Sequence, residues 1–338
     1  MSEKLEKARL YEIEEAKNIP QEEKPAFHVS APVGWINDPN GFSVFKGKVH
    51  LFYQYHPYSR DWGPMHWGHS VTEDMIRWEQ LPTALAPDQE YDREGCFSGS
   101  AIEADGKQAL IYTGVTTEKL PDGKEEVRQN QCLAWGDGKD YVKAEKNPVV
   151  TGDMLPEKCS RVDFRDPKVF WYEPAQKWYM IVSADKEMRF YASSNLKDWE
   201  YLSGFGKGYG VQPNQFECPD FIQLPVDGDK NNMKWVMIVN INPGCMFGGS
   251  ATEYFVGDFD GKEFKCDTKP EVTKWLDYGK DHYATVCFSN TGDRIIAVPW
   301  MSYWQYANIT PIKQYRGANA LPRELSLYTK DGQIYLAA

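Results

Sequence analysis

Three acidic residues occur in similar local sequences, each followed within two residues by a proline. Asp38 lies in Trp-Ile-Asn-Asp-Pro-Asn-Gly, Asp166 in Phe-Arg-Asp-Pro and Glu217 in Phe-Glu-Cys-Pro-Asp. Taken singly, each segment is more typical of a turn or of a solvated charge pair than of a functional site. Together, however, the three acids recur at corresponding places of a repeated strand pattern, and turns require no such register. We therefore treat Asp38, Asp166 and Glu217 as candidate catalytic residues.

Two carboxyl groups with different surroundings are what the hydrolysis of a glycosidic bond requires. One must be ionised to attack the anomeric carbon, and the other must be protonated to donate to the leaving oxygen. A third acid can bind sugar hydroxyls. Because Arg165 precedes Asp166, and a neighbouring cation favours the charged form of a carboxyl group, we expect Asp166 to be ionised and to bind hydroxyls.

The segments around these acids have the sequence pattern of β-strands. From Phe27 onward the apolar runs are about five to eight residues long and rich in aromatic and β-branched residues. Gly, Asn, Asp and Pro bound them. Runs of this kind predict strands rather than helices.

Two patterns recur about every 60 residues. One is a pair of strands with the spacing of a hairpin, and the other is a turn of Asp, Asn and Gly that leads to an aromatic residue. Five units of about four strands predict an all-β fold, a five-bladed β-propeller, in which equivalent positions converge on a central channel. A β-sandwich is the alternative, but it gives no reason for a five-fold recurrence. The expected hairpins are residues 38–55, 98–113, 166–182, 219–239 and 284–299, and the turns are 72–78, 136–141, 194–199 and 258–264.

The first residues differ from the rest. Residues 2–24 are highly charged, and Leu5, Ala8 and Tyr11 have helical spacing before Pro20. This pattern predicts a short helical arm. The expected organisation is an N-terminal arm over residues 1–25 and one propeller, the catalytic domain, over residues 26–338.

The composition excludes several classes of partner. The 338 residues hold 38 Lys and Arg against 49 Asp and Glu, a formal net charge of −11, which argues against nucleic acid and anionic membranes. The seven scattered cysteines are typical of free thiols in a reducing compartment. Neither a signal-peptide pattern nor an apolar run of membrane-spanning length is present. We expect a cytoplasmic protein as the sequence is given, with an exported parent left open.

Longer motifs around the acids resemble those of the family 32 glycoside hydrolases, the group of invertases, sucrose-6-phosphate hydrolases, exo-levanases and exo-inulinases. The segments at 35–41, 164–167 and 217–218 match the three signatures of that family in order. The resemblance covers about residues 26 to 330. Further matching segments are 53–57, 62–69, 97–100, 254–261, 275–279 and 321–325.

This resemblance implies a retaining exo-β-fructosidase that releases terminal β-D-fructofuranosyl units from sucrose or from fructans such as levan and inulin. By this resemblance Asp38 is the nucleophile, Glu217 the general acid and later base, and Asp166 the residue that stabilises the transition state. Asp277 and Lys280 match a pair that approaches the acid or the leaving group. The other positions that match the sugar pocket are Asn37, Asn40, Gln54, Trp62, Phe97, Ser98, Arg165 and Trp304, the last preferred to Trp300.

The sequence departs from the family pattern in three ways. A β-sandwich usually follows the propeller, and since the sequence given ends at Ala338 we expect this module to be absent. Tyr303 stands where levanase-like members often have Asn, which would reshape the floor of the pocket. The first half is closer to intracellular sucrose hydrolases and the part after about residue 215 to exo-levanases, so the length of the substrate stays open.

Two other functions stay open. A propeller of this kind could bind fructan or another sugar without catalysis, or it could be a fructosyltransferase in which a sugar replaces water as the acceptor. The presence of all three acids favours an enzyme, because a binding protein has no need of a separate proton donor.

The remaining sequence features give weaker indications of function. His50, His56, His66 and His69 have no matching acidic or thiolate set at ligand spacing, so we expect no metal and no cofactor. Ser98 has no evident His and Asp partners for a nucleophile, and Cys218 is interpreted as a buried packing residue. Among the tryptophans, those expected to stack on a sugar are Trp35, Trp62 and Trp304.

Overall fold

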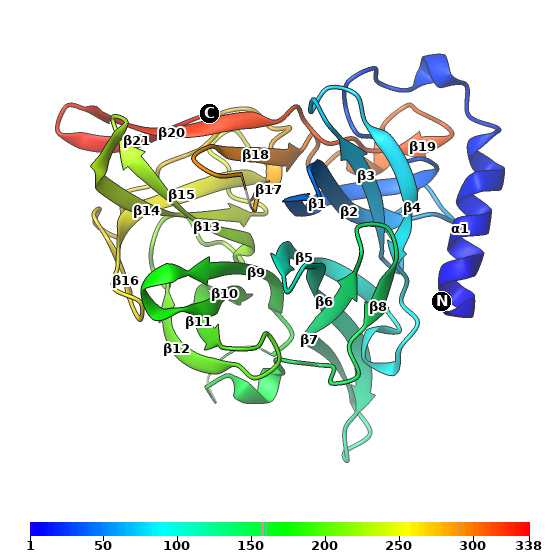
Figure 1. Ribbon diagram of the computed structural model, residues 1–338, viewed down its shortest axis with the longest axis horizontal. Coiled ribbons are helices and arrows are strands. Elements are labelled where there is room, and N and C mark those ends of the chain that lie inside the picture. The colour runs from blue at the N-terminus through cyan, green and yellow to red at the C-terminus, as the bar shows by residue number, and fades with distance from the viewer. Residues whose placement is uncertain (157–158, 160, 290) are drawn as a thin grey trace.

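The computed structural model describes residues 1–338 except 157, 158, 160 and 290, and strands arranged around a common centre make up most of it (Figure 1). The first three sheets each hold four consecutive strands. These are β1 (Gly34–Phe45), β2 (Lys48–His56), β3 (His66–Thr72) and β4 (Glu79–Leu85); β5 (Gly95–Ala104), β6 (Lys107–Lys119), β7 (Glu125–Gly136) and β8 (Tyr141–Lys143); and β9 (Phe164–Tyr172), β10 (Lys177–Ala184), β11 (Glu187–Ser193) and β12 (Glu200–Phe205).

Two further four-stranded units complete the set. They are joined into one sheet by a parallel pairing of β13 with β20 at Val226 and Leu327. A short strand, β19, pairs instead with β1. The strands are β13 (Glu217–Val226), β14 (Asp229–Ile241), β15 (Ala251–Phe259) and β16 (Phe264–Cys266), then β17 (Tyr283–Cys287), β18 (Ile295–Trp300), β19 (Tyr315–Arg316), β20 (Arg323–Lys330) and β21 (Gln333–Ala337).

The first strand of each unit lies innermost, and these strands form a closed ring. Along the ring, β1 neighbours β5, β5 neighbours β9, β9 neighbours β13, β13 neighbours β17, and β17 neighbours β1 again. The chain is therefore a five-bladed β-propeller, as the repeats predict, and not a β-sandwich.

Each pair of adjacent blades shares its own hydrophobic core. Phe52 of β2 packs with Leu110 of β6, and Val169 of β9 packs with residues of the second blade. Equivalent clusters join the third blade to the fourth, the fourth to the fifth and the fifth to the first. Burial between blades, rather than within a blade, therefore holds the ring together.

Every innermost strand is irregular near its beginning. The pairing register shifts after Ile36 in β1, after Phe97 in β5, beside Arg165 in β9, after Glu217 in β13 and after Tyr283 in β17. Such β-bulges bend a strand and re-aim its side chains, and they are places where proline is tolerated. The prolines that follow the three acids are therefore features of bulged strands rather than of turns between strands.

The N-terminal residues form the expected helix, α1 (Glu3–Ala16), capped by Ser2. Leu5, Ala8 and Glu12 are its buried residues, and they lie on the face that packs on β4. Glu12 accepts hydrogen bonds from the backbone N–H of Thr83 at 2.9 Å and from its hydroxyl at 2.6 Å. The described residues also form short 3₁₀ helices at Gln21–Glu23 (η1), Glu90–Asp92 (η2), Gly152–Met154 (η3), Glu173–Ala175 (η4) and Ala307–Ile309 (η5).

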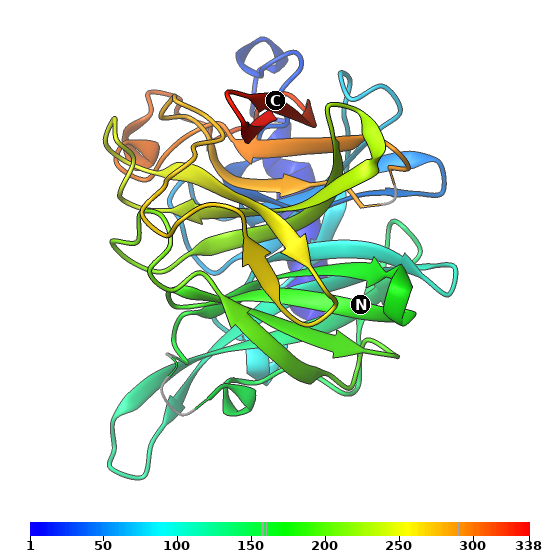
Figure 2. The same ribbon diagram turned by 90° about the vertical axis from the view of Figure 1, so that its left-hand side faces the viewer.

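The innermost strands of all five blades begin on the same side of the ring, which we call the mouth face. Because β-hairpins reverse direction, the loops that follow β14 and β18 also lie on this face. In Figure 2 the mouth face is on the left, where the hairpin between β6 and β7 projects furthest. No helix among the described residues is long and apolar enough to span a membrane.

Candidate active site

The three candidate acids meet at the mouth face, and Cys218 links them. Its backbone N–H donates to Asp166 Oδ2 at 2.8 Å, and its thiol donates to Asp38 Oδ2 at 3.5 Å. Its neighbour in the chain is Glu217. Acids from three different blades are thus brought together. Burial raises the pKa of the Cys218 thiol well above its usual range, so this cysteine acts as a donor and not as a nucleophile.

Asp38 is surrounded by neutral hydrogen-bond donors. Asn37 Nδ2 donates to Asp38 Oδ1 at 2.8 Å, and Ser98 Oγ donates to Asp38 Oδ2 at 2.7 Å. Burial raises the pKa of Asp38, the hydrogen bonds from Ser98 and Asn37 oppose this rise, and the charge of Glu217 adds to it. The donors fix both oxygens of a carboxylate that remains partly exposed to the mouth.

Glu217 has different partners. Arg165 Nη2 donates to Glu217 Oε1 at 2.7 Å, and the Tyr283 hydroxyl donates to Glu217 Oε2. Its side chain is 21% exposed, so a ligand in the mouth can reach it. The Arg165 guanidinium also contacts Gln129 at 3.2 Å and Asp163 at 3.1 Å, which holds it in place.

Arg165, Glu217 and Tyr283 occupy equivalent positions on three adjacent blades. Each immediately precedes a residue with a positive φ: Asp166 (+67°), Cys218 (+44°) and Ala284 (+54°). Non-glycine residues adopt this conformation at a cost, and such strain concentrates at functional sites. Because the same backbone conformation recurs on the three blades, the side chains of Arg165, Glu217 and Tyr283 lie next to one another.

Asp166 lies deeper than the other two acids. Its backbone N–H donates to Thr113 Oγ1 at 3.0 Å. Burial raises the pKa of Asp166 to about 7, against the attraction of Arg165, and the charges of Glu217 and Asp38 contribute to the rise. Arg165 lowers the pKa of Asp166, in the expected direction, but desolvation outweighs it because Arg165 donates its hydrogen bonds to other residues.

Asn37, Asn40 and Gln54, expected to line the sugar pocket, are 2%, 0% and 2% exposed. They form a buried network behind Asp38. Gln54 Nε2 donates to Asn40 Oδ1 at 3.0 Å, and Asn40 Nδ2 donates to Ser98 Oγ at 3.2 Å. This network orients Ser98 and, through it, Asp38.

The aromatic residues around the acids divide into supports and exposed rings. Trp35, expected to stack on a sugar, is fully buried, and its Nε1 donates to Asn37 Oδ1 at 2.7 Å. Trp304 stacks on Trp35 with centroids 6.0 Å apart and is partly exposed, whereas Trp300 is buried. Trp62 is 46% exposed and lies edge-on to Phe97 at 5.7 Å. Trp62 and Trp304 are thus open to the mouth, and Trp35 is a support.

Asp277 and Lys280, expected to approach the acid or the leaving group, have partners of their own in the structure. Asp277 accepts from the Gly279 N–H at 2.6 Å and from Arg323 Nη1 at 2.9 Å. Lys280 is exposed and lies over the ring of Tyr303 at 5.7 Å. Within the part of the chain that the structure describes, neither contacts the three acids through a hydrogen bond or an ion pair.

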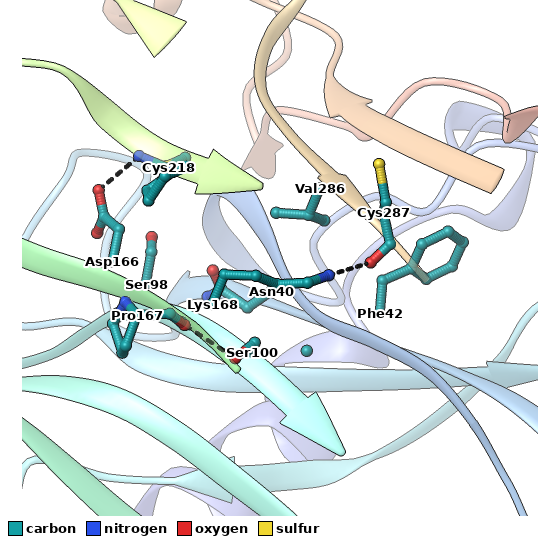
Figure 3. Close-up of a pocket in the computed structure, with 13 residues that line it drawn as sticks. Asn40, Phe42, Ser98, Ser100, Asp166, Pro167, Lys168, Cys218, Val286 and Cys287 are labelled. Carbon is teal, nitrogen blue, oxygen red and sulfur yellow. Dashed lines mark hydrogen bonds between the residues drawn. The ribbon is translucent and has the colours of Figure 1, made fainter. Parts of the chain in front are cut away.

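The channel below the acids is closed. Figure 3 shows the residues of all five innermost strands that enclose its upper part, among them Ser98, Asp166 and Cys218. The enclosed space of about 10 Å³ suits one water molecule and is too small for a sugar. Lys168 fills the channel further down, with Nζ 3.0 Å from Asp220 and 2.8 Å from the carbonyl of Cys287. Among the described residues, this enclosed space has no room for a sugar, so the mouth side of the acids is where a sugar would bind.

The sequence interpretation missed several residues of the site. The sequence pattern indicates only a packing role for Cys218, and it does not mark Tyr283, Thr113 or Gln129. One signal was available for Tyr283, since it directly precedes the fifth expected hairpin as Arg165 precedes the third. Across the described ranges, no group of three or more His, Cys, Asp or Glu side chains is arranged to hold a metal ion.

The chain is similar to known proteins in sequence and in fold. The family model described as the glycosyl hydrolases family 32 N-terminal domain matches residues 28–338. The levanase of Bacillus subtilis is 43% identical over 311 residues, which are 90% of this chain and 45% of the levanase. The invertase of Debaryomyces hansenii is 39% identical, with 93% of this chain and 59% of the invertase covered. The chain thus spans about half the length of these relatives.

The chain is also similar in fold to solved structures of such enzymes. An exo-inulinase from Aspergillus awamori superposes with a TM-score of 0.81 at 33% identity, covering 92% of this chain and 66% of that one. A β-fructofuranosidase from Schwanniomyces occidentalis, complexed with fructosyl-erythritol, superposes with a TM-score of 0.80 at 34% identity, covering 93% and 61%. The family model and these relatives show that the chain belongs to glycoside hydrolase family 32.

Proposed function

We propose that this protein is a retaining exo-β-fructosidase that releases terminal, non-reducing β-D-fructofuranosyl units from sucrose, levan or inulin. The observation that carries the proposal is the arrangement around Cys218, which joins three carboxyl groups with three different surroundings. A family 32 enzyme needs a nucleophile and a proton donor, and the site offers one carboxyl group for each role.

In the first step Asp38 attacks the anomeric carbon of the fructosyl unit. The donors on both of its oxygens, Asn37 and Ser98, hold it in one orientation, which lowers the cost of reaching the attacking geometry. Glu217 gives its proton to the leaving oxygen as the glycosidic bond breaks. The products of this step are a free leaving group and a fructosyl ester of Asp38.

In the second step Glu217, now ionised, takes a proton from water, and the water oxygen displaces Asp38 from the anomeric carbon. Asp166, held by Cys218 and Thr113, is placed to bind fructose hydroxyls in both steps. Two displacements retain the configuration, and the Asp38 and Glu217 carboxyl groups are expected to lie about 5–5.5 Å apart.

The relatives bear on the choice of substrate. Proteins named levanase, invertase and exo-inulinase are similar over nine-tenths of this chain or more, and all three names denote enzymes of β-fructosides. They do not select one substrate. We therefore propose the bond that is cut, a terminal β-fructofuranosidic bond, with sucrose and fructans as the candidate substrates.

The direct test measures fructose release from sucrose, inulin and levan by the wild type and by Asp38→Asn, Asp166→Asn and Glu217→Gln. We expect release by the wild type and a loss of turnover on the order of 10³-fold or more for Asp38→Asn. Asp331→Asn is a matched control, because Asp331 is exposed on the β20–β21 turn and its variant should keep full activity.

The alternatives predict different results. A sugar-binding propeller without catalysis would bind fructosides and release no fructose. A fructosyltransferase would release the leaving group but give longer fructosides in place of free fructose. Full activity of Asp38→Asn would show that the mechanism is wrong.

A further inference from the structure

An exposed apolar patch lies beside the mouth on the fourth and fifth blades. Met246, Phe247 and Tyr278 are 64%, 46% and 66% exposed. The rings of Phe247 and Tyr278 meet edge-on with centroids 6.2 Å apart. We call these three residues the rim patch.

The patch is tied to the catalytic end of the propeller. Phe247 lies in the loop after β14, and the end of β14 pairs with the start of β13, where Asn240 faces Glu217. Tyr278 lies in the segment that leads to Tyr283, the hydroxyl partner of Glu217. Two loops that reach Glu217 from different blades thus carry the patch.

A chain of contacts separates the patch from the acids. Asp38 contacts Asn37, Asn37 holds Trp35, and Trp304 stacks on Trp35. Next to Trp304, Tyr303 packs closely against Gly249 of the loop that carries Phe247. In this chain of contacts Trp304 comes before the rim patch, so we place Trp304 nearer the cleaved bond than Phe247.

Both loops are held in their conformations. The Phe247 loop closes on itself through Gly248 N–H to the Cys245 carbonyl at 2.8 Å and Cys245 N–H to the Gly249 carbonyl at 3.1 Å. Gly249 has φ +88° and faces the Tyr303 ring at a distance that leaves no room for a Cβ atom, so only glycine fits there.

The Tyr278 turn is pinned by Asp277. That carboxylate accepts from Gly279 and Arg323, and His282 Nδ1 lies 3.5 Å away. Asp277 therefore holds the turn while the adjacent Tyr278 ring faces solvent. A rigid aromatic surface of this kind loses little entropy when a ligand stacks on it.

We propose that the rim patch binds sugar units of the leaving group beyond the first, which makes it a determinant of activity on fructan chains as opposed to sucrose. This inference rests on the proposed function. Aromatic rings offer flat apolar faces to the C–H faces of a sugar, and Tyr278 adds a polar edge. Sucrose, whose leaving group is a single glucosyl unit, ends before the patch.

The size of the patch argues against a protein partner. A stable protein interface buries about 800 Å² on each side, far more than three side chains expose. Isolated apolar patches of this size on a protein surface are often functional sites. Continuity with the mouth then favours the substrate itself as the occupant.

Binding measured without turnover tests the inference. In the Glu217→Gln background, calorimetry would give Kd for sucrose and for an inulin-type oligosaccharide of five units, with and without Phe247→Ser and Tyr278→Ser. We expect the double substitution to raise Kd for the oligosaccharide about tenfold, which corresponds to about 1.4 kcal/mol. We expect Kd for sucrose to stay unchanged. Equal effects on both ligands, or none, would overturn the proposal.

A second exposed aromatic pair serves as the control. Trp171 is 40% exposed and meets Trp178 with centroids 5.0 Å apart near the β9–β10 turn, at the end of those strands away from the mouth. Trp171→Ser should leave both Kd values unchanged. If the patch were instead a contact between two copies, sedimentation of the double variant would show a change in mass with oligosaccharide affinity unchanged, which would also overturn the proposal. If the protein releases no fructose, the proposed function is wrong. The Kd values still test the rim patch, because they are measured without turnover.

Discussion

At the scale of single residues, the site depends on how hydrogen-bond donors are divided among three carboxyl groups. Cys218 serves two of them, through its backbone N–H to Asp166 and its thiol to Asp38. Glu217 receives a cation and a phenol instead. Burial raises the pKa of Asp166 to about 7, so at neutral pH this carboxyl group is protonated in part of the molecules.

Removal of the Tyr283 hydroxyl tests this division. Tyr283→Phe deletes the donor to Glu217 Oε2, and removing one partner of a buried hydrogen bond costs about 1–3 kcal/mol. We expect kcat on sucrose to fall about 10- to 100-fold and the pH profile of kcat to shift, with the melting temperature nearly unchanged.

Tyr191→Phe is the matched control for this substitution. Tyr191 is equally buried, and its hydroxyl has no hydrogen-bond partner among the described residues. The control should keep wild-type kcat and pH profile. If Tyr283→Phe behaves like Tyr191→Phe, the hydroxyl does not position Glu217.

The sequence alone predicted the acids and the tryptophans open to the mouth, but not which residues support them. Trp35, Asn40 and Gln54 belong to the motifs, yet they are buried. A sequence motif shows that a residue type is required at a position, but it does not show whether that side chain faces the ligand. The pKa of Asp166 was also beyond sequence reasoning, because it depends on desolvation and on where Arg165 directs its hydrogen bonds.

At the scale of elements, the bulges in the innermost strands decide where the functional side chains point. The hairpins were predicted correctly, but the strands begin earlier than expected, β1 at Gly34 instead of Asp38 and β9 at Phe164 instead of Asp166. The physical reason is local. Prolines and positive-φ residues resemble a turn in sequence, and only the pairing with the next strand shows a bulge.

A buried carboxyl group beneath two of the loops gives a test at this scale. Glu253 of β15 is fully buried, and both of its oxygens accept from the Val211 N–H, at 3.2 and 3.1 Å. Val211 lies in the segment that leads to Glu217, and the backbone of Glu253 pairs with Trp275 before Tyr283. Burial raises the pKa of Glu253 to about 8.

This shift predicts a dependence of stability on pH. Because the folded-state pKa lies above the unfolded value of about 4.3, the contribution of Glu253 is fully present below that value and is lost as the pH rises toward 8. In this window the group lowers the free energy of unfolding by up to about 1.4 kcal/mol per pH unit. Glu253→Gln should remove that slope in urea unfolding measured from pH 5 to 8.5.

Glu200→Gln, at an exposed site on β12, should leave the slope as in the wild type. An unchanged slope in Glu253→Gln would show that Glu253 does not bind its proton more tightly in the folded protein.

At the scale of the whole molecule, the propeller brings together residues that are far apart in the chain. Asp38, Asp166 and Glu217 come from the first, third and fourth blades, and the closed ring places the starts of these strands side by side. The five-fold repeat in the sequence was enough to predict this, because the core between each pair of blades needs the same strand pattern each time. The pairing of β19 with β1 could not be predicted, since two residues carry no periodicity.

The formation of a covalent bond at Asp38 tests the central claim most directly. A fructosyl fluoride carries a leaving group that needs no proton, so Glu217→Gln should react with it and then stall, because the base for the second step is missing. Mass spectrometry of the digested protein should find one fructosyl unit on the peptide that contains Asp38, and none when Asp38→Asn is combined with Glu217→Gln. Release of fluoride with no adduct on that peptide, or with the adduct on another residue, would contradict the assignment of Asp38 as the nucleophile.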